Sequence, residues 1–171
     1  MEQILQRLDR IEDDRFVFGS LFVAANLLET LLDRAFTPYG VTTKQFLLLI
    51  TIQSLFEAPP TIQETARAMG TSHQNVKQIA LNLERRGFLR LTKDGNDARV
   101  TRLALTDECR AFGEETNQAG EAFMRDMFQG VEAEDLGGAA RTLRALWQNA
   151  LAMKQADNGK ATGNQSKGTE K

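Results

Sequence analysis

The chain has 171 residues and a mass of 19.1 kDa, which suits one ordinary domain and leaves little room for a second independent core. Hydrophobic residues make up 42% and charged residues 26%, a globular balance that excludes disordered, collagen-like and disulfide-scaffold proteins. The single cysteine, Cys109, has no partner for an internal disulfide, and Glu2 and Asp9 stand where a secretory signal would carry basic residues. These features predict a cytoplasmic protein.

The charge is unevenly distributed along the chain, although the formal net charge is only -2. Residues 61–105 carry 8 Lys/Arg and 4 Asp/Glu, whereas residues 1–60 and 106–154 have net charges of -3 and -4. Phosphate contact requires local positive potential rather than a basic whole protein, so this pattern suits a polyanion-binding module on an acidic scaffold. A solvated charged face is the alternative.

Residues 1–40 are predicted to form a long N-terminal helix region. Apolar residues recur every three or four positions as far as Phe36, and Pro38 and Gly40 close the helix. Between Phe16 and Leu32 the apolar positions cover more than one stripe, so the helix must bury more surface than one neighbouring helix covers. A partner chain is one way to supply that cover.

The most apolar part of this helix is not expected to cross a membrane. The nearly apolar stretch from Phe16 to Leu28 is interrupted by Ser20 and Asn26. It is shorter than the ~20 residues that a membrane-spanning helix needs.

A second helix is predicted to begin at Thr42 or Thr43, either of which can cap it. Its run from Phe46 to Ile52 is apolar nearly all round, so we expect this run in the core. Pro59 and Pro60 then break the chain.

Two short helices follow, joined by a tight turn that contains glycine. Thr61 opens the first, which covers Ile62–Met69 and stops at Gly70. Thr71 or Ser72 caps the second, which runs from Ser72 to Arg86 and ends at Gly87. This arrangement predicts a helix-turn-helix. The second helix would face inward through residues at helical spacing: Val76, Ile79, Ala80 and Leu83.

Beyond Gly87 the hydrophobic period changes from helical to alternating. Residues 89–92 and 100–105 alternate apolar and polar side chains, and the turn-rich residues 93–97 lie between them. This pattern predicts a β-hairpin, so residues 41–105 together should form a winged helix-turn-helix.

Residues 106–154 are predicted to be helical. Thr106 can cap a long helix to about Phe128, and a further helix covers Glu134 to Met153. Residues 155–171 contain few apolar side chains and are expected to be a disordered tail. The predicted fold class is therefore mostly α, with a small β-hairpin wing on a winged helix-turn-helix between terminal helices.

Over roughly residues 10–153 the chain resembles the MarR family of winged-helix transcription regulators. The resemblance implies an obligate homodimer built from the terminal helices, a pseudo-palindromic DNA operator, and often an anionic aromatic ligand or oxidant that releases the DNA. In two places the chain departs from the family: Leu91 stands where an arginine is usual, with Arg90 one position earlier, and Cys109 replaces a glycine. The features that carry the resemblance are Val41-Thr42-Thr43-x-Gln45-Phe46, Leu83-Glu84-Arg85-Arg86-Gly87-Phe88, and Asp97-x-Arg99 followed by Leu105-Thr106.

The candidate DNA-binding residues lie on the outward face of the second short helix and on the hairpin. Glutamine can pair with adenine and lysine can reach guanine or phosphate, whereas an arginine near a hairpin tip can enter the minor groove. Ordinary polar surface is the alternative for each of them. The candidates are Thr71, Ser72, His73, Gln74, Lys77, Gln78, Arg85, Arg90, Lys93, Asp97 and Arg99, with Asp97 expected to orient Arg99.

Other candidate sites have weaker support in the sequence. Phe16, Phe22, Tyr39 and Phe46 could line a pocket for a small aromatic effector, although aromatic side chains at helical spacing are usually core. No metal site or cofactor is expected, because the chain has one histidine and one cysteine. Cys109 could sense an oxidant, but a small half-buried residue is the better interpretation, since Asp107 and Glu108 oppose thiolate formation.

The sequence favours a homodimeric, sequence-specific DNA-binding regulator in which a small ligand releases a repressor. The alternative is a winged-helix module that binds protein with the same face. An enzyme is not expected, because no phosphate loop, metal spacing or set of acid, base and nucleophile is found.

Overall fold

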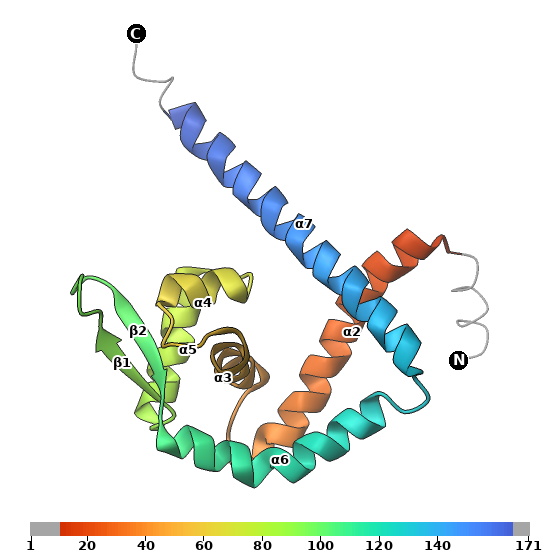
Figure 1. Ribbon diagram of the computed structural model, residues 1–171, viewed down its shortest axis with the longest axis horizontal. Coiled ribbons are helices and arrows are strands. Elements are labelled where there is room, and N and C mark those ends of the chain that lie inside the picture. Colours follow the sequence, from red (N-terminus) through yellow and green to blue (C-terminus); the bar gives the residue numbers. More distant parts are fainter. Residues whose placement is uncertain (1–10, 166–171) are drawn as a thin grey trace. The chain divides into compact units, whose positions relative to one another are not determined.

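The computed structural model describes residues 11–165, and the side chains up to residue 156. The chain divides into two compact units, Met1–Arg110 and Ala111–Lys171. The mostly helical fold with one two-stranded antiparallel sheet confirms the predicted winged helix (Figure 1). The first unit contains α2 (Asp13–Phe36), η1 (Thr37–Tyr39), α3 (Thr43–Leu55), α4 (Ile62–Ala68), α5 (His73–Arg85), β1 (Leu89–Lys93) and β2 (Thr101–Leu105).

Hydroxyl side chains begin the three helices of the winged helix, as the sequence predicts. Thr42 and Thr61 each form a capping box with the residue three positions later, Gln45 and Glu64. The Thr61 N–H donates to the Glu64 carboxylate at 2.7 Å, and this bond lowers the pKa of Glu64. The Ser72 hydroxyl accepts from the third backbone N–H of α5. Each cap satisfies an N–H that has no partner inside the helix.

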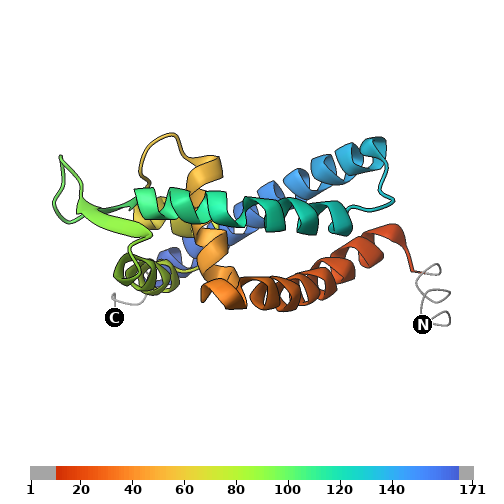
Figure 2. The same ribbon diagram turned by 90° about the horizontal axis from the view of Figure 1, so that it is seen from below.

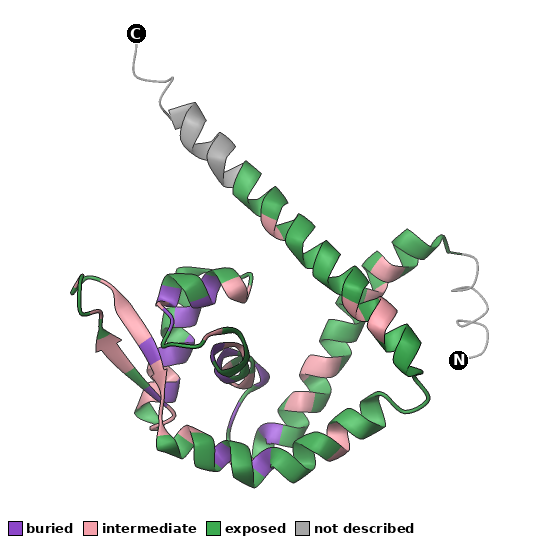
Figure 3. Ribbon diagram, in the orientation of Figure 1, coloured by how far each residue is buried: buried purple, intermediate pink, exposed green. Residues whose placement is uncertain are grey.

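The inner face of α5 forms the centre of the core. Val76, Ala80 and Leu83 are fully buried, and Leu48 of α3 and Leu103 of β2 are fully buried with them. Figure 3 shows most of the buried residues on α3, α4, α5 and the hairpin, with a few others at the end of α2 and on α6. The four inward positions that the sequence predicts on α5 are therefore confirmed. The core cluster comprises Leu48, Leu49, Ile52, Ile62, Ala66, Val76, Ile79, Ala80, Leu83, Leu89 and Leu103.

The hairpin pairs Leu89 with Leu105 and Leu91 with Leu103, so that leucines face one another across the two strands. Its second strand is attached to the loop before α4, because the Leu103 N–H donates to the Pro60 carbonyl at 2.8 Å. The connecting loop extends beyond the helices of this unit (Figures 1 and 2). The base of the hairpin therefore belongs to the core, while its tip stands in solvent.

The helix α2 ends at Phe36, four residues earlier than the Gly40 stop predicted by the sequence. Pro38 has no N–H to continue the α-helical ladder, and residues 37–39 tighten into a single 3₁₀ turn. Gly40 follows with φ of 62°, a left-handed conformation that glycine adopts without strain. The N-terminal part of the predicted first helix region, residues 1–10, lies outside the described residues.

A carboxylate joins the end of α2 to the start of α3. Asp33 accepts from the backbone N–H of Thr43 at 2.8 Å and from its hydroxyl at 2.7 Å. These hydrogen bonds lower the pKa of Asp33. The Lys44 ammonium lies 3.4 Å from Glu29 and adds an ion pair between the same two helices.

One expectation about α3 is wrong in part. The sequence predicts that its apolar run lies in the core, yet Leu47 is 43% exposed and Ile50 is 41% exposed. A helix has only one side toward each neighbour, and the core takes the side with Leu48, Leu49 and Ile52. Hydrophobicity alone does not tell which of two apolar faces this chain covers.

The sequence predicts that the first helix is too short in apolar residues to cross a membrane, and the length of the helix in the structure does not support that argument. Residues Asp13–Tyr39 form a helix long and apolar enough to cross a membrane, with a mean hydropathy of 1.5. Core helices of soluble proteins pass the same test. In this chain the helix carries Asp33, which hydrogen-bonds to α3.

The second unit consists of the rest of α6 (Asp107–Met127) and α7 (Ala133–Gln165). The Thr106 hydroxyl accepts from the Cys109 N–H at 3.2 Å and caps α6 as predicted. The sequence predicts a disordered tail from residue 155, whereas α7 continues to Gln165. No proline interrupts this stretch, and extending an existing helix costs less than starting one. The end of the predicted tail, residues 166–171, lies outside the described residues.

The bond between α2 and α3 predicts a pH dependence of stability. A carboxyl whose pKa is lowered by folding stabilises the fold above its unfolded pKa, which is about 3.9 for aspartate, and this contribution disappears as the pH falls through the folded value. Asp33→Asn should therefore be less stable than the parent at pH 7 and should lose less stability between pH 5 and pH 3. Urea unfolding at several pH values measures this difference, and parallel pH profiles would contradict it.

Candidate nucleic-acid interface

The outward face of α5 presents a row of polar side chains near its N-terminus. Gln74, Lys77 and Gln78 are exposed and make no hydrogen bond or ion pair with any part of the chain that the structure describes. They line a surface hollow together with Ser72, Asn75 and Leu81. Because the opposite face of the helix is buried in the core, these side chains are held toward solvent. The structure therefore brings together four of the residues singled out by the sequence, Ser72, Gln74, Lys77 and Gln78.

Asn75 belongs to the same surface, although it is not among the candidates that the sequence predicts. Its side-chain amide donates to the Thr71 hydroxyl at 2.9 Å. Its backbone N–H donates to the Ser72 hydroxyl at 3.1 Å. The spacing of four residues between Thr71 and Asn75 was the available signal, since residues at this spacing are neighbours on a helix surface.

His73 and Arg85 lie at opposite ends of α5. His73 is exposed in the first turn, next to the polar row. Arg85 lies in the last turn, where its guanidinium bonds to the Leu81 carbonyl and to the side chain of Asn82. The structure thus groups His73 with the row, whereas Arg85 lies about 10 Å along the helix axis beyond Gln78, the last residue of the row.

The hairpin tip holds one arginine in an oriented and exposed position. The Asp97 carboxylate accepts from Nε and Nη2 of Arg99, each at 3.1 Å, and from the Arg99 backbone N–H at 2.9 Å. These bonds lower the pKa of Asp97. The Arg99 side chain is nevertheless 91% exposed. Asp97 therefore orients Arg99 from one side and leaves the rest of its guanidinium free to meet an anion.

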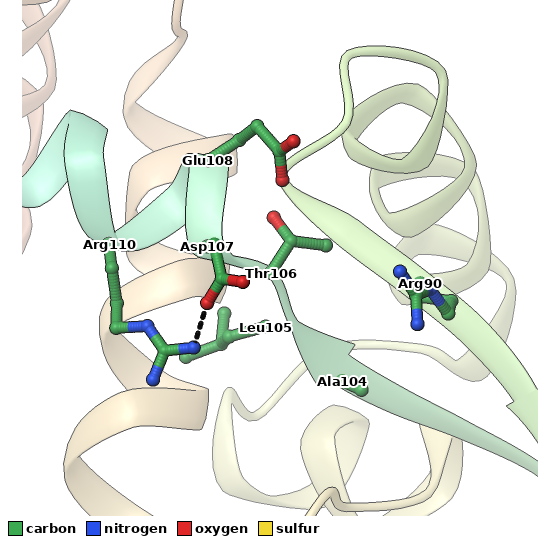
Figure 4. A pocket seen from close by; sticks show the side chains of 7 residues that line it. All are labelled: Arg90, Ala104, Leu105, Thr106, Asp107, Glu108 and Arg110. Carbon is green, nitrogen blue, oxygen red and sulfur yellow. Dashed lines mark hydrogen bonds and ion pairs between the residues drawn. The ribbon is translucent and has the colours of Figure 1, made fainter.

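The two other cations of the hairpin occupy different ends of it. Lys93 pairs with Thr101 next to the tip, whereas Arg90 pairs with Ala104 near the base. Figure 4 shows the pocket at the base, where Arg90 lines one side and an ion pair between Arg110 and Asp107 lines the other. Of the two, only Lys93 lies on the same end of the hairpin as Arg99.

Leu91 has a structural reason to replace the arginine usual at this place. Its side chain packs against the core cluster. Its backbone N–H donates to the Glu84 carboxylate at 2.8 Å, which joins β1 to α5. This position therefore serves the attachment of the wing.

Comparison with known proteins shows what this geometry is similar to. The chain is 33% identical to the transcriptional repressor MprA of Escherichia coli over 73 residues, which are 43% of this chain and 42% of the relative. The match thus spans less than half of the length of that curated relative. The structure of Sco3205, a MarR family transcriptional regulator of Streptomyces coelicolor in complex with DNA, superposes with a TM-score of 0.70 and 22% sequence identity. The superposition covers 79% of this chain and 86% of the Sco3205 chain.

The structure of CouR of Rhodococcus jostii, bound to p-coumaroyl-CoA, superposes with a TM-score of 0.67 and 19% sequence identity. The superposition covers 80% of this chain and 92% of the CouR chain. Many other matching structures are MarR family regulators. The chain has the MarR fold. The resemblance seen in the sequence is therefore confirmed, although no protein-family model matches the chain.

The four aromatic residues selected as pocket candidates do not form one cluster within the first unit of this MarR fold. Phe22 packs edge-on against Phe18 in α2, with 5.2 Å between ring centroids. Phe46 packs against Phe36 with 4.3 Å between ring centroids, and Tyr39 lies in the turn that follows Phe36. These ring pairs are separated by about 21 Å along α2. Phe16 is exposed one and a half turns before Phe22.

Cys109 is half-buried at the start of α6 and packs against the core. Burial raises the pKa of its thiol, and the nearby Arg110 offsets this only in part. A raised pKa leaves little thiolate at neutral pH, so the environment opposes reaction with oxidants. Among the residues that the structure describes, no group of three His, Cys, Asp or Glu side chains could hold a metal ion.

The environment of Cys109 predicts slow thiol chemistry. At pH 8 the folded protein should react with iodoacetamide several-fold more slowly than the same protein in 8 M urea, because both burial and the raised pKa protect the thiol. Peroxide should affect DNA binding equally in the parent and in Cys109→Ser. A folded-state rate equal to the unfolded rate would contradict this protection, and protection from peroxide by the serine would show that Cys109 is a sensor.

Proposed function

We propose that this chain is a homodimeric, sequence-specific DNA-binding transcription regulator of the MarR family that acts in the cytoplasm. The observation that carries the proposal is the row of unpaired polar side chains on α5, Gln74, Lys77 and Gln78, held outward by a buried inner face. A helix of this kind can enter the major groove with its N-terminal residues at the base edges. Arg99 on the hairpin tip would meet the neighbouring minor groove.

Each part of this surface has a role that its chemistry suits. The amides of Gln74 and Gln78 can each donate to and accept from adenine, and Lys77 can reach guanine or phosphate. Ser72 and Thr71 lie at the helix N-terminus, which favours phosphate. Arginine enters a narrow minor groove because of its negative potential. Base contacts would thus come from α5, and the wing would add electrostatic affinity.

Dimer formation is supported by the apolar surface that one chain leaves uncovered. On α2, the side chains of Phe18, Phe22, Val23 and Leu27 are 60 to 65% exposed. On α7, Leu143 and Trp147 are 47% and 45% exposed. Apolar surface on this scale marks an interface. A second copy would cover these helices and place two winged helices on one duplex, with half-sites about one helical turn apart.

Repression released by a small aromatic ligand is the mode of action that we propose. The matched relative in Escherichia coli is a transcriptional repressor, and CouR, which shares the fold, was solved with p-coumaroyl-CoA. A ligand that binds better to a dimer with the wrong spacing between its two α5 helices would lower DNA affinity to that extent. Tyr39 and Phe46 lie near the end of α2, where such a change would reach the winged helix.

Binding measurements on duplexes selected from a random pool test the proposal. Arg99→Ala should weaken binding to every duplex by about tenfold and reduce the slope of log affinity against log salt by about 0.9, because one phosphate-like contact is lost. Gln78→Ala should instead reduce discrimination between the selected duplex and a scrambled one. The melting temperature should change in neither variant. If the parent chain ignores all duplexes at low salt, a protein-binding winged helix is the better account.

A further inference from the structure

The hairpin tip is tied to the body of the winged helix by a second arginine, Arg102. This residue lies in β2 opposite Thr92. Its Nη1 donates to the Pro59 carbonyl at 2.9 Å, and its Nε bonds to the Asp94 carboxylate. One guanidinium therefore joins the strand, the loop before α4 and the tip of the hairpin.

Asp94 in turn organises the tip itself. Its carboxylate accepts from the backbone N–H groups of Asn96 at 2.9 Å and Asp97 at 3.2 Å. The Asp94 side chain is only 11% exposed, although it lies in a surface loop. These bonds, together with the contact from Arg102, lower the pKa of Asp94. The residue that orients Arg99, Asp97, is thus itself fixed by Asp94.

The contacts form a continuous chain from the body of the fold to the exposed arginine. Pro59 binds Arg102, Arg102 binds Asp94, Asp94 binds the Asp97 backbone, and Asp97 binds Arg99. A two-stranded hairpin is marginally stable by itself, and its tip lies beyond the buried leucines. Without these contacts, the hairpin tip would be conformationally free in the unbound protein. DNA binding would then have to order the tip, and this loss of entropy would reduce the affinity for DNA.

We propose that Arg102 is a positioning residue for the wing: it holds the hairpin tip so that Arg99 is presented to DNA, and it makes no DNA contact of its own. This inference rests on the proposed function. The charge of Arg102 is already balanced by Asp94, and it also lies close enough to Glu64 to influence that carboxyl. Its side chain is 39% exposed, against 91% for Arg99. Arg102 is therefore engaged inside the protein, whereas Arg99 is available outside it.

A double-mutant cycle in DNA binding tests this role. Arg102→Ala should weaken binding to the selected duplex by about tenfold, as Arg99→Ala does, because both remove the same contact. In the Arg99→Ala background, Arg102→Ala should change affinity by less than about twofold and leave the salt slope unchanged. Additive losses, or a further fall of about 0.9 in the slope, would show that Arg102 touches phosphate and would overturn the proposal.

Two variants serve as controls for charge. Arg125→Ala removes an exposed arginine in the last turn of α6, outside the proposed DNA surface, and should leave affinity unchanged. Arg102→Lys keeps the charge but loses the planar fork that reaches two acceptors, so it should restore little of the affinity. Full restoration by lysine would show that the charge alone matters, which contradicts positioning.

Amide hydrogen exchange gives a readout that does not involve DNA. In the full-length Arg102→Ala protein the amides of Asn96 and Asp97 should exchange faster, while the amides of α3 and α5 keep the parent rates. Unchanged exchange at the tip would overturn the proposal even if DNA affinity fell. If the parent chain binds no duplex, the proposed function fails, whereas faster exchange at the tip would still show that Arg102 orders the wing.

Discussion

The burial of one face of α5 against α3 and the hairpin is the interaction on which the rest of this structure depends. Val76, Ala80 and Leu83 have no exposed surface, and they meet Leu48 and Leu103, which are equally buried. Rolling the helix by one residue would turn it by about 100° and bring polar side chains into this core at a cost of several kcal/mol. The side of α5 that faces solvent is therefore determined by the side that is buried. Burial of the apolar face of α5 thus holds Gln74, Lys77 and Gln78 toward solvent.

A second constraint is the attachment of the winged helix to the end of α2. Asp33 joins the end of α2 to the start of α3 through Thr43. At the C-terminal end of α5, the Arg86 guanidinium donates to the carbonyls of Tyr39 and Gly40 and lies over the Phe88 ring. Both contacts meet at the junction between α2 and α3. These contacts join α2 and the turn after it to the start of α3 and to the end of α5.

Much of the fold could be predicted because its signals are local. The caps at Thr42, Thr61 and Ser72 depend on residues within one helical turn, and the structure confirms each of them. The alternation that predicts the hairpin is similarly short-range. The outward position of Gln74, Lys77 and Gln78 followed from helical periodicity alone.

The remaining features depend on contacts that no local pattern contains. Leu47 and Ile50 look like core residues, but their exposure depends on which face of α3 the chain covers. Pro59 and Arg102 meet across 43 positions of sequence, so the attachment of the wing has no signature in either segment. The separation of Arg90 from the hairpin tip likewise required the strand register.

The central claim is that a homodimer holds the outward faces of its two α5 helices about one helical turn of DNA apart. Sedimentation analysis of the complex with duplexes that carry the selected half-site twice, at varied spacing, tests it most directly. The account predicts two chains per duplex and an affinity that falls at least about tenfold when the half-sites are shifted by half a helical turn and recovers at the full turn. One chain per duplex, or an affinity indifferent to the spacing, would contradict it.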